Sequence, residues 1–564
     1  ENSVDSNYAR LARTMASAKA AYHILDGLKL STIFTVDYSL NKDFFFYSPD
    51  GKDGEATQGS GQMMMIERMS YTSQTNLAYN KTFGKHNINA VLAYEVMKYD
   101  YEDMYGEKQV YGQTLNPSLD NGAKPADLTN TRQEDAMVSY VGSLNYGYND
   151  KYYAGFSFRR DGSSRLAPDT RWGNFWAVSA SWRLSQENFM KPWEDVVSDM
   201  KLRASYGVNG NLPTGYYGYH GTYTTGAFYN GKPAPWEDAI ANPDLTWEKN
   251  YALNLGVDLS LFRRVNLTFD WYTRTTKDLL MSKQLNSISG FGSILTNVGE
   301  MKNTGFEIEV RSSNIQTKDF SWTTSLNLSH NKNKIVKLAD LIDGNYIRKE
   351  GCSYATIYLR EYAGVDPNDG RPMYYDNKED ENGNRSRNIV YDPNDADRVE
   401  LKDIYPKLTG GLMNTFNYKF IDLSFNLSFH LGGYSYDGAM YALQDDGYTA
   451  QYNKSTELRR RWKQPGDITD VPRYVYGQEY GGWWNSSRGV HSTDHLRLKS
   501  LIVGVSAPQS WLRTIGINSA RIYFSGTNLL TWAAYDQYDP ELNGIVSYFT
   551  PPLKTFAFGL ELKF

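Results

Sequence analysis

The sequence has little of what most enzymes and most helical membrane proteins need. It contains one cysteine, Cys352, which excludes internal disulfides and cysteine-rich metal sites. No run of about 18 apolar residues occurs, which excludes a membrane-spanning helix but not a spanning strand. The motifs G-x-S-x-G and H-E-x-x-H and the Walker phosphate loop are also absent. We therefore expect no catalytic residues and a protein that is not an enzyme.

Charge of one sign is not in large excess either. The formal net charge is -5 over 564 residues, so no basic field attracts nucleic acid and no nucleic-acid partner is expected. The first ten residues, ENSVDSNYAR, are polar and lack the apolar segment of a signal peptide. Either a leader has been removed or the natural start of the protein lies elsewhere.

The chain is instead rich in aromatic residues. They make up 15% of the sequence, with 45 tyrosines and 13 tryptophans, although the mean hydropathy is low at -0.59. Soluble cores draw more on leucine, isoleucine and valine. Transmembrane β-barrels need aromatic side chains at two membrane interfaces and a polar interior, which fits this combination.

Apolar and polar residues alternate in many segments, among them 176–184, 253–261, 423–431 and 555–564. A period of two indicates strands whose two faces meet different solvents. Between 306 and 311, Phe, Ile and Val alternate with Glu, Glu and Arg. If the apolar face meets lipid, one misplaced charge at the bilayer midplane costs about 2–4 kcal/mol, so this segregation is expected. The pattern predicts an all-β, antiparallel transmembrane barrel.

Short and long connections alternate along the chain. Short turns are predicted at Asp26-Gly27 and at several later positions, because Asp-Gly favours a hairpin. Long polar connections are predicted at 97–134, 209–249, 331–410, 432–495 and 529–554. Transmembrane barrels have short periplasmic turns and long extracellular loops. This arrangement predicts a bacterial outer-membrane location in a Gram-negative cell.

The number of predicted strands is about 17. Single-chain bacterial barrels usually have an even number of strands and both termini in the periplasm. An odd number places Glu1 in an extracellular loop. We therefore expect residues 1–564 to be the C-terminal part of a larger barrel, with an odd number of earlier strands outside this chain.

Several segments carry a resemblance to one family, and they follow one another in the family's order from near Tyr152 to Phe564. The chain resembles the SusC/RagA-like TonB-dependent transporters of the bacterial outer membrane. The segments are RRDGSSR (159–165), WGNFWAVSASWRLSQENF (172–189), KLRASYGVNGN (201–211), NPDLTWE (242–248), LTNVGEMKNTGFE (295–307), YPKLTGGL (405–412), LRLKSL (496–501), SGTNLLTW (525–532) and YDPEL (538–542).

The resemblance implies a plugged barrel of about 22 strands, with a TonB-binding segment at its N-terminus. It also implies a SusD-like surface lipoprotein that acts as a lid, dimers of transporter–lid pairs, and an oligosaccharide or peptide cargo. Membrane lipid and lipopolysaccharide would surround the barrel. We see no plug, TonB-binding segment or first strands in this sequence, and we expect them in another part of the same transporter. A passive porin or structural barrel remains an alternative, and a barrel-borne hydrolase is a further one.

Aromatic residues in predicted loops are the candidates for contact with cargo or lid. One group lies in EYGGWWN and a second in YYGYHGTY. Aromatic faces suit sugar rings and also anchor protein interfaces, and the alternative is packing within the loop or anchoring near the membrane. The candidate residues are Tyr480, Trp483, Trp484, Tyr216, Tyr217 and Tyr219.

One acidic segment, YDPNDADRVELKD (391–403), resembles a calcium loop. Its candidate ligands are Asp392, Asn394, Asp397 and Asp403. The segment departs from an EF-hand loop, which needs an oxygen ligand at its fifth position and Gly at its sixth, because Ala396 and Asp397 stand there. A solvated acidic turn is the alternative, and no other cofactor is expected.

Overall fold

The computed structural model describes residues 5–112, 117–340, 344–449, 451–477, 485–513, 516–542, 544–546 and 549–564. They form two compact units. Unit 1 comprises Glu1–Trp182, Ser205–Tyr251 and Thr276–Val298. Unit 2 comprises Arg183–Ala204, Ala252–Thr275 and Gly299–Phe564. In the described parts of the chain, no helix is long and apolar enough to cross a membrane.

Most of the chain is β-structure, and 17 strands belong to one sheet. The sequence predicted about this number, and the all-β class is confirmed. The strands of this sheet are β1 (Ser6–Leu25), β2 (Leu28–Tyr47), β3 (Ser60–Phe83), β4 (His86–Tyr111), β5 (Gly122–Tyr148), β6 (Tyr152–Ser163), β7 (Trp172–Arg183), β8 (Val197–Asn211), β13 (Glu248–Leu261), β14 (Val265–Gln284), β15 (Ser293–Gln316), β16 (Phe320–Lys337), β23 (Leu408–Tyr418), β24 (Ile421–Leu431), β27 (His495–Ser506), β28 (Ser519–Ala533) and β30 (Thr555–Lys563).

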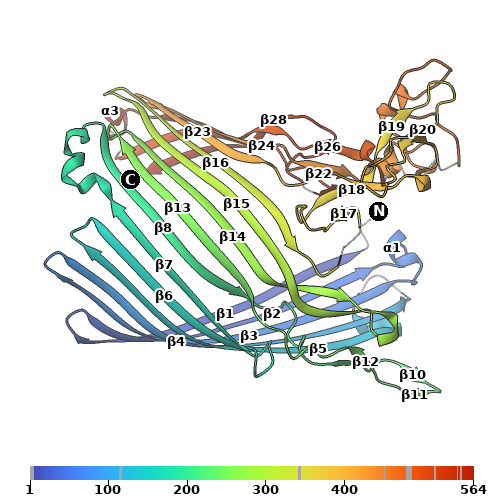
Figure 1. Ribbon diagram of the computed structural model, residues 1–564, viewed down its shortest axis with the longest axis horizontal. Coiled ribbons are helices and arrows are strands. Elements are labelled where there is room, and N and C mark those ends of the chain that lie inside the picture. The colour runs from blue at the N-terminus through green and yellow to red at the C-terminus, as the bar shows by residue number, and fades with distance from the viewer. Residues whose placement is uncertain are drawn as a thin grey trace. The chain divides into compact units, whose positions relative to one another are not determined.

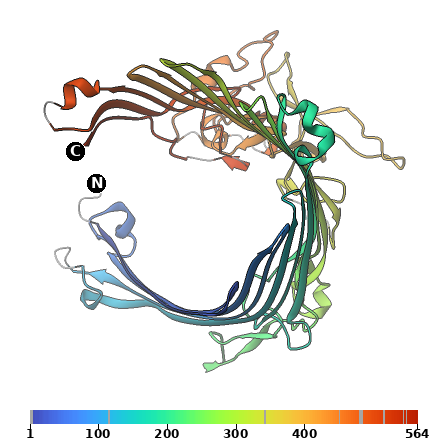
Figure 2. The same cartoon turned by 90° about the vertical axis from the view of Figure 1, so that its left-hand side faces the viewer.

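In unit 1, β1 to β6 pair in chain order as antiparallel neighbours. Figure 1 shows β1 to β4 as long ribbons that lie side by side, and Figure 2 shows these blue and cyan strands in one curved layer. The predicted Asp26-Gly27 turn joins β1 to β2. Gly27 has a φ of +82°, and a Cβ there would lie 2.6 Å from the carbonyl oxygen of Asn80, so this turn requires glycine.

The strands of unit 1 are longer than the sequence predicted. The long connection expected at 97–134 is wrong, because β4 continues to Tyr111 and β5 begins at Gly122. Lys98 pairs with Ala136 and Glu102 with Arg132 inside this predicted loop. A spanning strand needs only about 9–11 residues, whereas β4 has 26. Both faces of the extra length can be polar, so alternation disappears although the ladder continues.

In unit 2, the strand register pairs like with like. Between β15 and β16, Ile308 lies opposite Leu328 and Val310 opposite Leu326, while Glu309 lies opposite Asn327. Glu309 also forms a 2.6 Å ion pair with Arg311 on its own face of β15. Apolar and polar residues therefore form two separate faces, as the sequence predicted.

The last strand of unit 2 ends the sheet as predicted. β30 pairs with β28 from Thr527 opposite Thr555 to Ser519 opposite Lys563. Its phenylalanines and leucines at alternate positions are exposed, with Phe558 82% exposed. Such an exposed apolar stripe is unfavourable in water, and the described part of the chain does not cover it.

Smaller elements fold within the connections. Unit 1 contains α1 (Lys52–Glu55), the 3₁₀ helices η1 (Leu119–Asn121) and η4 (Ser287–Ser289), and the strands β9 (Thr222–Thr224), β10 (Phe228–Tyr229), β11 (Lys232–Pro233) and β12 (Trp236–Ala239). Unit 2 contains η2 (Leu184–Gln186), η3 (Asn188–Trp193), η5 (Pro393–Asp395), η6 (Thr456–Arg460), η8 (Ser487–Gly489), α2 (Met440–Leu443) and α3 (Gln509–Leu512). Its short strands are β17 (Tyr346–Ile347), β18 (Thr356–Arg360), β19 (Tyr362–Val365), β20 (Pro372–Tyr375), β21 (Ile389–Val390), β22 (Arg398–Asp403), β25 (Tyr434–Asp437), β26 (Val490–Ser492) and β29 (Gly544–Val546).

These connections have cores of their own. In unit 1, Leu166, Phe175, Leu245 and Trp247 form a buried cluster. In unit 2, Ile357, Leu359 and Tyr436 form another. The long loops are therefore packed structures rather than loose chain, and they can hold side chains in fixed positions.

Candidate functional site

The tyrosine loop between β8 and β13 lies in unit 1. Its three candidate residues differ in their surroundings. Tyr219 packs against the cluster that contains Leu166 and Trp247, so its main role is structural. The Tyr216 ring lies under the guanidinium of Arg165, 4.4 Å from ring centroid to Cζ. Tyr217 is 43% exposed, and its hydroxyl accepts a hydrogen bond of 3.1 Å from the backbone N–H of Glu134.

Arg165 holds this loop in place. Its side chain donates to the Asp135 carboxylate at 3.0 Å and to the carbonyl of Pro213 at 3.1 Å. Asp135 is buried, so the pair is shielded from water. Arg165 thereby connects β5 to the start of the loop and places its guanidinium over Tyr216. Of the three tyrosines, Tyr217 has the largest surface left for a partner molecule.

The second aromatic group lies outside the described residues. Tyr480, Trp483 and Trp484 fall in 478–484, so their predicted role stays a prediction. A cluster of polar groups in unit 2 joins residues near 442–449 to Lys454 and Arg488.

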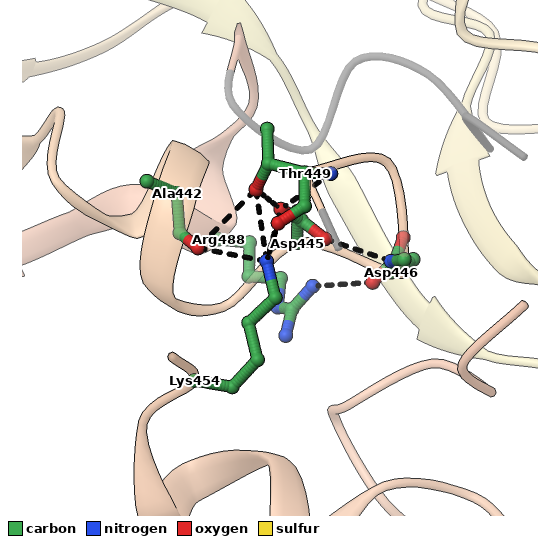
Figure 3. Close-up of polar contacts among 7 residues, drawn as sticks. Ala442, Asp445, Asp446, Thr449, Lys454 and Arg488 are labelled. Carbon is green, nitrogen blue, oxygen red and sulfur yellow. Dashed lines mark hydrogen bonds and ion pairs between the residues drawn. The ribbon is translucent and has the colours of Figure 1, made fainter. Parts of the chain in front are cut away.

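The centre of this cluster is a lysine with four acceptors (Figure 3). The ammonium of Lys454 donates to the Asp445 carboxylate at 2.7 Å and to the carbonyl oxygens of Ala442 and Thr449, both at 2.8 Å. Its fourth partner is the Thr449 hydroxyl at 2.8 Å. The Asp445 carboxylate also accepts from the backbone N–H groups of Gly447 and Thr449. Lys454 therefore ties Ala442, Asp445 and Thr449 together, and we call this arrangement the lysine staple.

Next to the lysine staple lies a second buried pair. Asp446 is 3% exposed, and its carboxylate lies 3.4 Å from the Arg488 guanidinium. Burial raises the pKa of Asp446 to about 6, and the attraction of Arg488 only partly opposes this. The backbone of Asp446 is fixed too, because its carbonyl accepts from the N–H of Val475 at 2.9 Å. Arg488 is thus held at one position by a carboxylate that carries its charge near neutral pH.

The candidate calcium ligands of the acidic segment make separate structural contacts. The Asp392 carboxylate caps η5 by accepting from the N–H of Asn394 at 2.8 Å. Asp403 ends β22 and accepts from the N–H of Tyr405 at 3.0 Å. The N–H of Asp397 donates to the carbonyl of Asp376. Among the described residues, no three His, Cys, Asp or Glu side chains form a group that could hold a metal ion. The calcium hypothesis stays a prediction.

One polar network was missed by the sequence reading. Arg497, whose side chain is 3% exposed, donates to Asp539 at 2.7 Å and to Glu541 at 3.1 Å. Lys499 reaches Glu541 at 2.6 Å. These residues belong to LRLKSL and YDPEL, which the sequence reading used only for the resemblance. The available signal was two basic residues two apart on β27 and two acids in the loop after β28.

Comparison with known proteins decides the family. The family model for the β-barrel of TonB-dependent receptor-like proteins matches residues 2–449. This chain belongs to the TonB-dependent receptor-like β-barrel family. Family members are outer-membrane transporters and not enzymes, which agrees with the predicted lack of enzymatic activity and with the predicted outer membrane, while the orientation of the loops stays a prediction. The predicted resemblance to SusC and RagA is confirmed by individual relatives as well.

Two relatives and one solved structure illustrate this. The TonB-dependent receptor P3 of Formosa agariphila is 31% identical over 615 residues, covering 100% of this chain and 59% of the relative. The TonB-dependent receptor SusC of Bacteroides thetaiotaomicron is 27% identical over 565 residues, covering 96% of this chain and 55% of SusC. The structure of the RagAB peptide transporter matches with a TM-score of 0.89 at 25% identity, covering 100% of this chain and 63% of that one. This receptor barrel therefore spans somewhat more than half the length of its relatives.

Proposed function

We propose that this chain supplies wall and loops of a SusC-like, TonB-dependent importer in the outer membrane, with oligosaccharides or peptides as its cargo. The observation that carries the proposal is the 17-stranded sheet with segregated faces, matched along its whole length by a transporter structure at a TM-score of 0.89. An apolar face in hydrocarbon and a polar face toward an aqueous interior is the arrangement of a barrel wall.

The packed loops support a partner on the outer surface. A SusD-like lipoprotein would close over them as a lid, and the exposed face of Tyr217 is one candidate contact. The long connections then lie outside the cell, and the short turns, such as Asp26-Gly27, lie in the periplasm. Membrane lipid and lipopolysaccharide contact the outer face, and two transporter–lid pairs associate into a dimer.

The proposed mechanism requires the whole protein. The lid captures cargo and closes, energised TonB pulls on a plug in the lumen, and cargo passes along the polar face of the sheet. This sequence of steps needs strong anchoring of the loops, because the lid contacts must persist while the lumen opens. The lysine staple and the Arg497 network provide such anchoring.

Uptake in cells tests the proposal. Cells with the full-length protein and its lid take up labelled oligosaccharides or peptides, and deletion of tonB abolishes that uptake. Outer-membrane levels of the protein, measured by immunoblot, serve as the control. Uptake that continues without TonB would overturn the proposal and favour a passive porin, because diffusion through an open pore needs no energy coupling.

A further inference from the structure

A cavity of about 260 Å³ lies among the loops of unit 2, apart from the tyrosine loop. It has a buried floor and an open rim. Met440, Gln444 and Val471 line the floor and are buried. Arg460 and Asp470 line the rim, with side chains that are more than half exposed. The cavity is thus open to solvent on one side and closed by buried side chains on the other.

Four of the five charged side chains that line the cavity are already in ion pairs, and the fifth, the exposed Asp536, accepts a hydrogen bond from the Gln537 amide. On the rim, the Arg460 guanidinium lies 2.5 Å from Glu457 and 3.6 Å from Asp470. In the floor, Arg488 has Asp446 behind it at 3.4 Å. A charged ligand would compete with these pairs, and separating the buried pair would leave a charge without its partner. The cavity therefore disfavours a ligand with a strong net charge.

The side-chain amide of Gln444 is an uncharged hydrogen-bonding group in the floor of the cavity. It is 8% exposed, and its side-chain amide makes no hydrogen bond within the described chain. An amide offers two donor hydrogens and one acceptor oxygen, and here they face the cavity, where water or a ligand can bond to them. A ligand that both donates and accepts would satisfy this group.

The aromatic wall of the cavity is fixed. The rings of His491 and Tyr535 stack with centroids 3.7 Å apart and planes at 2°. The Tyr535 hydroxyl donates to Asp437 at 2.7 Å, and Met440 sulfur lies 3.5 Å from Nε2 of His491. These contacts hold the wall in one orientation, so the cavity keeps its shape without a ligand.

We propose that this cavity binds one neutral sugar residue of an oligosaccharide cargo. Each hydroxyl of a sugar can donate to a carboxylate and accept from a guanidinium at once, so it fits between paired charges without separating them. The size agrees, because pockets for whole drug-sized molecules are about 300–1,000 Å³ and this one is smaller. The inference rests on the proposed importer function and specifies one contact of its cargo.

Binding to the full-length transporter with its lid tests this assignment. The probes are maltoheptaose, cellohexaose and laminarihexaose as neutral oligosaccharides, hexagalacturonate as an acidic one, and a tryptic digest of casein as peptides. We expect a neutral oligosaccharide to bind in isothermal titration calorimetry. Gln444→Leu should weaken its Kd about tenfold, because the ligand loses the hydrogen bonds of the amide.

Two further variants make the test specific. Gln464→Leu is the matched control, since Gln464 is exposed and does not line the cavity, and its Kd should equal that of the wild type. Ala534→Trp fills the cavity from its exposed rim, so it should abolish binding without disturbing the buried floor. Circular dichroism and sedimentation of each variant show whether it is folded.

Several outcomes would overturn the inference. Neutral binding that neither Gln444→Leu nor Ala534→Trp weakens would place the sugar elsewhere and leave the importer intact. Exclusive binding of casein peptides or hexagalacturonate would contradict a neutral site, again with the importer intact. If no neutral oligosaccharide binds, the inference also fails, and the TonB dependence of uptake decides separately whether the importer function stands.

Discussion

Arg203 and Asp270 are joined across the strand that separates them. Arg203 on β8 donates from Nη1 to Oδ1 of Asp270 at 2.9 Å and from Nη2 to Oδ2 at 3.0 Å. β13 lies between β8 and β14 in the sheet, and it carries Gly256 at the crossing point. Arg521 and Asp422 repeat this arrangement across Gly504 of β27, with bonds of 2.9 and 2.6 Å. In both cases the glycine on the middle strand leaves room for an ion pair between the two outer strands.

Filling this crossing should weaken the sheet. A Cβ at position 256 would lie 2.5 Å from Oδ1 of Asp270 and 2.6 Å from Cζ of Arg203. Gly256→Ala should therefore displace the bridge and lower the free energy of unfolding by about 1–3 kcal/mol. Urea unfolding in detergent measures it. Gly106→Ala is the matched control, because its Cβ meets nothing closer than 3.9 Å. Equal stability of both variants would show that the bridge tolerates the methyl group.

Loss of the lysine staple should open its loop locally. Lys454→Met leaves the Asp445 carboxylate, 1% exposed, without its counter-ion. Removing one partner of a buried pair costs about 3–5 kcal/mol, here in the local stability of 442–454. Hydrogen exchange measured by mass spectrometry should show faster exchange in this segment and no change in β1 to β4. Lys463→Met, at an exposed position, should change nothing. Unaltered exchange in Lys454→Met would contradict the staple.

The pKa of Asp446 predicts a pH dependence with a definite sign. Its pKa is about 6 in the folded chain, against an ordinary value of 3.8. The folded state therefore binds the proton more tightly, and this group destabilises the fold above about pH 6 and less so as the pH falls toward about 4.

Asp446→Asn isolates this effect, since asparagine does not titrate. The local stability of the variant relative to the wild type should be highest near pH 7 and should decline as the pH falls to about 5. Hydrogen exchange of the segment around 446, corrected for intrinsic rates, measures it. A difference that stays constant over this range would show that Asp446 titrates at its ordinary pKa.

Two residues of the tyrosine loop are expected to differ in role, one in contact with a partner and the other in packing. Tyr217 is 43% exposed, so Tyr217→Ala should weaken lid or cargo affinity about tenfold and lower the melting temperature less than Tyr219→Ala does. Tyr219 packs on the cluster of Leu166 and Trp247, so Tyr219→Ala should mainly lower the melting temperature. Pull-down of the lid and differential scanning fluorimetry provide the two readouts. If both variants lower only stability, the loop is structural.

Prediction from the sequence was most accurate for strands whose two faces meet different solvents. β30 was expected at 555–564 and spans Thr555–Lys563, and the connection expected at 432–495 lies between the ends of β24 and β27. Alternation failed in the outer half of β5, because residues 122–134 are mostly polar on both faces, whereas the outer half of β4 keeps it only from Met97 to Glu102. There the ladder is stabilised by pairing with long neighbours, such as Glu102 opposite Arg132, which no local pattern reports.

The polar sites of the loops lay beyond sequence reasoning for a related reason. Lys454 meets Ala442 and Asp445 only after the segment closes on itself, and Arg488 meets Asp446 from 42 residues away. Composition marked these loops as polar, but it did not distinguish a solvated charge from a buried, fully bonded one. The aromatic residues were easier to find because tyrosine and tryptophan are conspicuous in any loop.

The central claim is that every second side chain of the sheet faces hydrocarbon. Spin labels on single cysteines along β30, in a Cys352→Ser background, test it in a reconstituted bilayer. Labels at Phe556, Phe558 and Leu560 should collide with oxygen, which concentrates in lipid, while labels at Ala557 and Glu561 should collide with a water-soluble nickel complex. Strict alternation is the predicted result. Equal accessibility of both sets, or water contact at the phenylalanines, would contradict the account.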